Sequence, residues 1–187
     1  MQTSNQPPFV HGQKRVTIEN WLEGDQISWF GFTPEEWLAA LAKPQLSKHV
    51  PQSIKKLFEA SRGAMAYGWF HRAILNLASD QIFRVCELAA IRRADRAGIT
   101  TAYPRNSSEK KPRNRPFSDI VKDLEKGGII NGIDVERWNG FVKGRNTVSH
   151  PKTHTQALPE GALGVLTFSC ACVNNLFNSK AVRDPLP

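Results

Sequence analysis

Arg145 and His150 are the two side chains of this chain whose types and spacing most clearly suggest chemistry. Residues 145–150 read Arg-Asn-Thr-Val-Ser-His, and Pro151 follows. A guanidinium stays protonated at physiological pH and an imidazole titrates near neutrality, so together they can handle a phosphodiester without a metal ion. Asn146 places a polar group beside the arginine. We therefore take Arg145, Asn146 and His150 as the candidate catalytic residues.

The proline decides whether the arginine and the histidine can meet. On an ideal helix, five steps turn a side chain by about 140°, so the two would lie on different faces. The residue before a proline is disfavoured in the α region. We therefore expect His150 to leave the helix and to turn back toward Arg145.

Both residues also have a structural interpretation. Arg145 could neutralise the negative end of its helix, and His150 could form a hydrogen bond with a turn carbonyl. Lys143 and Lys152 flank the motif and, with Arg145, contribute three positive charges without an acid between them. This stretch is either a track for phosphates or a solvated basic turn.

Residues 104–116, PRNSSEKKPRNRP, form a second basic segment that begins and ends with proline. Its net charge is +4, because five basic residues outnumber the single acid Glu109: Arg105, Lys110, Lys111, Arg113 and Arg115. A loop of this kind can bind an RNA backbone, although such loops are also often merely exposed. We include these five residues as candidate RNA-binding residues.

The composition indicates one folded domain with an anionic partner. The chain has 187 residues, five tryptophans and a net charge of +8, which favours nucleic acid over a membrane surface as the partner. Its three cysteines lie in apolar helical patterns, as expected of buried thiols in a reducing cytosol. No stretch is apolar and long enough to span a membrane, so we expect a cytoplasmic protein.

Neither a metal nor another cofactor is indicated. His150 and His154 are four residues apart, but Pro151 interrupts the helix that would align them. The Cys170-x-Cys172 pair does not have the usual spacing of a zinc site. No glycine-rich phosphate-binding motif is present, since Gly127-Gly128 lacks the lysine and the preceding strand.

The periodicity predicts an all-α fold, a bundle of four or five helices with an N-terminal extension. Thr33-Pro34-Glu35-Glu36 has the pattern of a capping box and predicts a short helix ending before Pro44. Further helices are expected over residues 53–97 with a break near Gly63 or Gly68, over 120–126 after a Ser118 or Asp119 cap, from 134 into the 145–150 motif, and over 159–178. We divide the chain into an N-terminal extension (1–50), a helical domain (51–180) and a tail (181–187).

An all-helical body with Arg, four residues and His before the last helix resembles the HEPN superfamily. The signature of that family is Arg, four to six residues and His, usually with Asn, Asp or His directly after the Arg. Arg145, Asn146 and His150 fit its four-residue form. The resemblance covers residues 52–178, whereas residues 1–50 resemble no family that we recognise.

The resemblance implies a metal-independent endoribonuclease of the toxin or defence type, acting on single-stranded RNA. HEPN proteins typically dimerise, so that two Arg/His motifs line one composite cleft, and some are held inactive by an antitoxin or a sensor protein. In this chain His150 would transfer protons, Arg145 would stabilise the charge on the phosphate, and Asn146 would position one of these groups. The alternative is a catalytically silent HEPN-like module that binds RNA, a nucleotide or a protein.

Overall fold

A computed structural model describes residues 30–103, 114–149 and 157–178. In these ranges the chain forms six helices: α1 (Pro34–Ala42), α2 (Gln52–Tyr67), α3 (Ala73–Arg96), α4 (Phe117–Lys126), α5 (Ile133–Ser149) and α6 (Pro159–Asn178). An isolated bridge between Ala102 and Asn114 is the sole β-type pairing within them. The expected all-α class is therefore confirmed.

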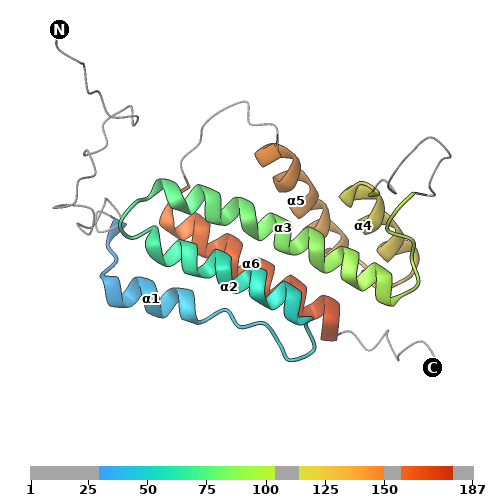
Figure 1. Ribbon diagram of the computed structural model, residues 1–187, viewed down its shortest axis with the longest axis horizontal. Helices are drawn as coiled ribbons and strands as arrows, with labels where there is room; N and C mark the ends of the chain where they lie inside the picture. Colours follow the sequence, from blue (N-terminus) through green and yellow to red (C-terminus); the bar gives the residue numbers. More distant parts are fainter. Residues whose placement is uncertain (1–29, 104–113, 150–156, 179–187) are drawn as a thin grey trace, which may run out of the picture.

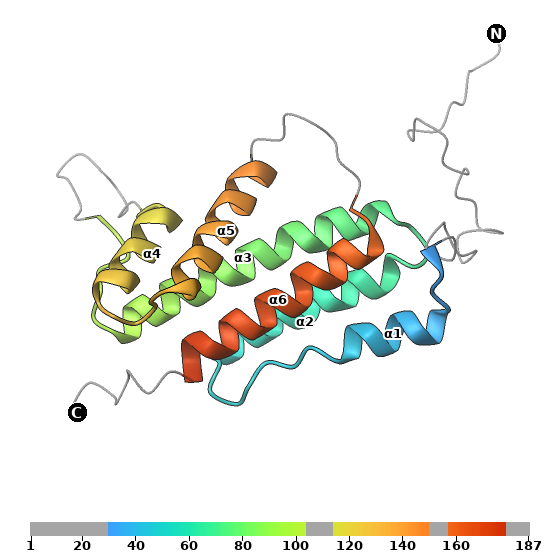
Figure 2. The ribbon, with the colours of Figure 1, turned by 180° about the vertical axis from the view of Figure 1, so that it is seen from behind.

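Helix α3 is the centre of the bundle. It packs against α2 and α6 on one side and against α4 and α5 on the other, and Figure 1 shows the short helix α1 beside α2. Figure 2, the reverse view, shows α6 lying along α2 while α5 diverges from it. Such a central helix needs apolar residues on several faces, and α3 accordingly buries, among others, Leu75, Ile82, Val85 and Ala89.

The helix ends confirm most of the local sequence signals. The Thr33 hydroxyl accepts a hydrogen bond from the Glu36 backbone N–H, and the Glu36 carboxylate accepts one from the Thr33 backbone N–H, which completes the capping box at the start of α1. The break between α2 and α3 falls at Gly68, the second of the two glycines considered. Gly98 follows α3 with a φ of 72°, a conformation in which a residue without a Cβ is favoured.

The start of α4 differs from the expectation. The helix begins at Phe117, and Pro116 occupies its N-cap position. Ser118 and Asp119 therefore lie inside the first turn, and no side chain caps the helix. Proline fixes the backbone here and removes one of the donors a cap would satisfy, so the helix starts without a polar cap. Phe117 is buried against Trp138 of α5, and this contact holds the first turn of α4.

One core joins all six helices. It includes Trp37 of α1, Phe58 of α2, Ile82 of α3, Leu124 of α4 and Leu166 of α6, and Trp138 connects α5 to it. The short helix α1, assigned above to the N-terminal extension, thus shares the core of the helical domain. Across the residues described, no helix has both the length and the apolar character to cross a membrane.

Candidate functional site

Helix α5 comes close to Phe83 of α3 at Gly144, the residue before Arg145. A Cβ placed on Gly144 would lie 2.4 Å from Cε1 and 2.7 Å from Cζ of Phe83, which is far closer than carbon atoms can approach. Gly140, one turn earlier on α5, has no atom within 4 Å of such a Cβ. A side chain at 144 would therefore require the Phe83 ring or the two helices to move, and Arg145 directly follows this contact along α5.

Arg145 is joined to α3 by a charged hydrogen bond. Its Nε donates to Oε2 of Glu87 at 3.0 Å, and the two side chains are 26% and 30% exposed. The contact joins residues that lie 58 positions apart in the sequence. A half-buried pair of this kind restricts the arginine side chain to one region of the surface while leaving the site accessible to solvent.

Two further charged residues of α3 belong to the same surface. Asp80 is partly buried and Arg84 is exposed, and with Glu87 they follow one another at spacings of four and three residues. Burial raises the pKa of Asp80 above its ordinary value, and the positive charges of Arg84 and Arg145 oppose this rise. Arg145 therefore lies among charges of both signs, the acids Asp80 and Glu87 and the arginine Arg84.

Two polar residues close to Arg145 in the sequence of α5 face the solvent. Lys143 and Asn146 are both exposed. The Thr147 hydroxyl forms a hydrogen bond within the helix, since it donates to the carbonyl oxygen of Lys143 at 3.0 Å. His150 directly follows α5 in the sequence, but it and Lys152 lie outside the described residues, so the expected turn of His150 toward Arg145 stays a prediction.

Among the five basic residues of the 104–116 segment, the structure describes only Arg115. Its guanidinium forms an ion pair with Asp123 at 2.5 Å and donates to the Thr100 carbonyl oxygen at 2.7 Å. The Asp123 carboxylate raises the pKa of Arg115. Arg115 thus connects Thr100 to Asp123 of α4, while Arg105, Lys110, Lys111 and Arg113 lie outside the described residues.

The cysteines are buried, as expected. Burial raises the pKa of the Cys86 thiol to about 12 and that of Cys172 to about 11, and it also raises the pKa of Cys170. Thiols of this kind are poor nucleophiles and poor metal ligands. Within the described ranges, no group of three or more His, Cys, Asp or Glu side chains is arranged to hold a metal ion.

Sequence reasoning identified Arg145 but did not assign it a partner. Asp80, Arg84 and Glu87 stand out in the sequence as regularly spaced charges, and this spacing was the available signal. Near the C-terminal end of α5 the structure holds one guanidinium in place, with an exposed lysine two residues before it and an exposed amide one residue after it, and a guanidinium of this kind can bind a phosphate or a carboxylate. Comparison with protein-family models, with curated proteins and with solved structures finds no match to this chain.

Proposed function

We propose that this protein is a metal-independent endoribonuclease that cleaves single-stranded RNA with Arg145, Asn146 and His150. The observation that carries the proposal is the bond from Arg145 to Glu87, because it holds the guanidinium at the end of α5 from which the chain continues to His150. The resemblance of residues 145–150 to the HEPN motif supports the same activity, of the toxin or defence type.

The chemistry uses the 2′-hydroxyl of the RNA as the nucleophile. His150 transfers a proton from this hydroxyl or to the leaving 5′-oxygen, and Arg145 stabilises the charge that develops on the phosphate. Asn146 positions the phosphate or the imidazole. The products carry a 2′,3′-cyclic phosphate, and DNA resists cleavage because it lacks the 2′-hydroxyl.

Binding of the RNA backbone is assigned to basic residues on both sides of the motif. Lys143 is exposed two residues before Arg145 on α5. Lys152 and the 104–116 segment add further positive charge that follows phosphates without reading bases. Arg115, the last basic residue of that segment, forms an ion pair with Asp123 and so contributes to this only indirectly.

A homodimer is part of the proposal. One arginine and one histidine are a small catalytic set for phosphodiester cleavage, and a two-fold axis doubles this set without any further sequence. A dimer that brings two α5 ends together also doubles the positive charge available to the RNA. A clean monomer by light scattering at working concentrations would contradict this arrangement, and an antitoxin or sensor protein is a further possible partner.

The Arg145–Glu87 pair also favours a second candidate function. An arginine that already has a carboxylate partner can serve to hold two helices together, and the protein would then be a silent HEPN-like module that binds RNA, a nucleotide or a protein. In this function His150 would have no catalytic role. The two candidates differ in turnover, and one experiment separates them.

The test is cleavage of a labelled single-stranded RNA in EDTA by the wild type, R145A and H150A. We expect the wild type to cut and to leave cyclic-phosphate ends, and both variants to lose at least about a hundredfold in rate. R92A is the matched control, because Arg92 is an exposed arginine that pairs only with Asp95 among the described residues. A DNA strand of the same sequence should stay intact.

Variants of Glu87 give a second test of the site in the same cleavage assay. E87Q keeps an oxygen that can accept from Arg145 Nε, whereas E87A removes it, so E87A should lose about ten- to a hundredfold in rate and E87Q less. Absence of cleavage by all proteins, with RNA binding intact, would reject the nuclease and support the binding module. Equal cleavage by the wild type, R145A and H150A would reject the site itself.

A further inference from the structure

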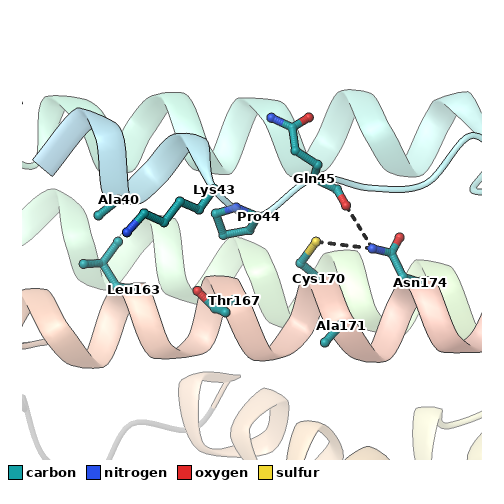
Figure 3. A pocket seen from close by; sticks show the side chains of 9 residues that line it. All are labelled: Ala40, Lys43, Pro44, Gln45, Leu163, Thr167, Cys170, Ala171 and Asn174. Atoms are coloured by element: carbon teal, nitrogen blue, oxygen red, sulfur yellow. Dashed lines mark hydrogen bonds between the residues drawn. The ribbon is translucent and has the colours of Figure 1, made fainter. Parts of the chain in front are cut away.

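A groove lies between α1 and α6, on the side of the bundle away from α5. Its volume is about 450 Å³, and the residues along it include Ala40, Lys43 and Pro44 on one side and Leu163, Thr167 and Cys170 on the other. Figure 3 shows these side chains from close by, with the Lys43 side chain extending along the groove toward Leu163. The volume is within the range of sites that bind ligands or short segments.

At the end of the groove near Asn174, hydrogen bonds join α6 to the segment that follows α1. Asn174 donates to the Gln45 carbonyl oxygen at 2.9 Å and to Cys170 Sγ at 3.6 Å, and its Oδ1 accepts from the Ser47 backbone at 2.7 Å. Arg62 donates to the Pro44 carbonyl oxygen at 3.2 Å and so holds the same connection to α2. These bonds fix residues 44–47 against α6 and α2, so this wall of the groove is held in place by the fold.

The polar groups that are left in the groove suit an acidic, apolar occupant. Among the described residues, neither the Lys43 ammonium nor the Thr167 hydroxyl has a hydrogen-bond or ion-pair partner. Most of the remaining surface is contributed by carbon and sulfur atoms of α1 and α6. An occupant that places a carboxylate at Lys43 and apolar side chains over Leu163 and Pro44 would satisfy both features.

Charge along the sequence identifies a matching segment in the same chain. Residues 16–29 contain three acids and no lysine or arginine, and six of the fourteen residues are large and apolar: Val16, Ile18, Trp21, Leu22, Ile27 and Trp29. On one side the groove is lined by Ala40, Lys43, Pro44 and Gln45, and residues 37–58, which include them, contain four lysines and no acid. Residues 161–178 of α6, which form the other side, contain no charged residue.

The connection to the described part of the chain allows this segment to reach the groove. Phe30 lies beneath the Arg72 guanidinium at 5.6 Å, and Phe32 packs edge-on against Trp37 of α1. Helix α1 is about 13 Å long and the groove follows α6 for about 16 Å. Fourteen residues span about 46 Å when extended and about 21 Å when helical, so either form can run back along α1.

We propose that residues 16–29 of this chain occupy the groove between α1 and α6, with their acids near Lys43 and their apolar side chains over Pro44, Leu163 and Cys170. The local concentration of a tethered segment is high, so a weak interaction is sufficient for docking. The proposal does not depend on the nuclease activity, since the groove lies away from Arg145.

The test is the rate at which N-ethylmaleimide modifies an added thiol in the full chain. T167C places the thiol in the groove, and N175C places one on the exposed face of α6 outside it. The native thiols are buried and react slowly, and the modified peptides are identified by mass spectrometry. We expect I18S/W21S/L22S to speed modification of the T167C thiol about tenfold, as the loss of about 1.4 kcal/mol of docking requires.

Three comparisons complete the experiment. The N175C thiol should react at the same rate with and without the serine substitutions, which shows that the fold is intact. K43Q alone should speed the T167C reaction, and E19Q/E23Q/D25N should add little to K43Q if these acids act through Lys43. Equal T167C rates in all variants would overturn the proposal, and so would protection that disappears on dilution, because that would assign the groove to a second copy.

Discussion

G144A tests the placement of Arg145, because it adds one methyl group where α5 meets α3. Three ring atoms of Phe83 lie within 3.0 Å of the position of this methyl group, so the ring must turn away or the two helices must separate. Overpacking of this kind costs about 1–3 kcal/mol. Replacing glycine by alanine within a helix returns about 0.5–1 kcal/mol. We expect G144A to lower the free energy of unfolding by about 1 kcal/mol.

G140A is the matched control, since the same substitution one turn earlier meets no atom within 4 Å. It should raise the free energy of unfolding by about 0.5–1 kcal/mol through helix propensity alone. The two variants should therefore differ by about 1–3 kcal/mol, which is the cost of overpacking. Urea denaturation followed by circular dichroism measures this difference directly.

A double mutant assigns the effect to Phe83. F83L shortens the side chain that the new methyl group meets, so F83L/G144A should be more stable than the sum of the two single effects by about 0.5–1 kcal/mol. G144A that is as stable as G140A would refute the reasoning, because α5 would then not approach α3 so closely. The Arg145–Glu87 contact depends on that approach and would lose its basis as well.

Three further predictions concern charges and thiols. Burial raises the pKa of Asp80, so ionisation favours the unfolded state; D80N should therefore be more stable than the wild type at pH 7, and this advantage should disappear in urea titrations as the pH falls below the raised pKa. A less stable D80N at neutral pH would mean that attraction to Arg84 and Arg145 outweighs burial. R115A should lose about 1 kcal/mol of stability in urea denaturation, because it removes the ion pair with Asp123, whereas K122A, an exposed lysine of the same helix α4, should change stability little; equal effects would contradict the assigned role. Cys86 should resist alkylation at pH 8 in the native protein and react fully in urea, since burial raises its pKa to about 12; rapid native labelling read by mass spectrometry would show that α3 opens locally.

The helices and most of their ends were predictable because their signals are local. The capping box at Thr33 and Glu36 and the glycine after α3 each act over a few residues, so the sequence contains the whole interaction. The start of α4 was not predictable in this way. Its first turn is held by Phe117 against Trp138, and this contact comes from packing between two helices.

The candidate site was predictable as a motif but not as an arrangement. Arg145 is prominent in the sequence, whereas its bond to Glu87 depends on how α5 crosses α3. Gly144 illustrates the same limit, since a glycine in a helix weakens the helical signal and only the nearby Phe83 ring explains it. Arg115 was assigned to RNA on charge alone, and its ion pair with Asp123 gives it a structural task as well.

The bond between Arg145 and Glu87 has a direct consequence for how any phosphate would bind. A carboxylate beside the guanidinium lowers the net positive charge of the site, so this arginine alone attracts an anion less than an unpaired one would. The same bond limits the rotation of the side chain, and a fixed donor stabilises a developing charge with less reorganisation than a mobile one. Affinity for RNA must then come from elsewhere: from Lys143, from Lys152 and the 104–116 segment, and from a second copy in the proposed dimer. We therefore expect substitutions of Lys143 to act on RNA binding and its salt dependence, and substitutions of Glu87 to act on the rate of cleavage.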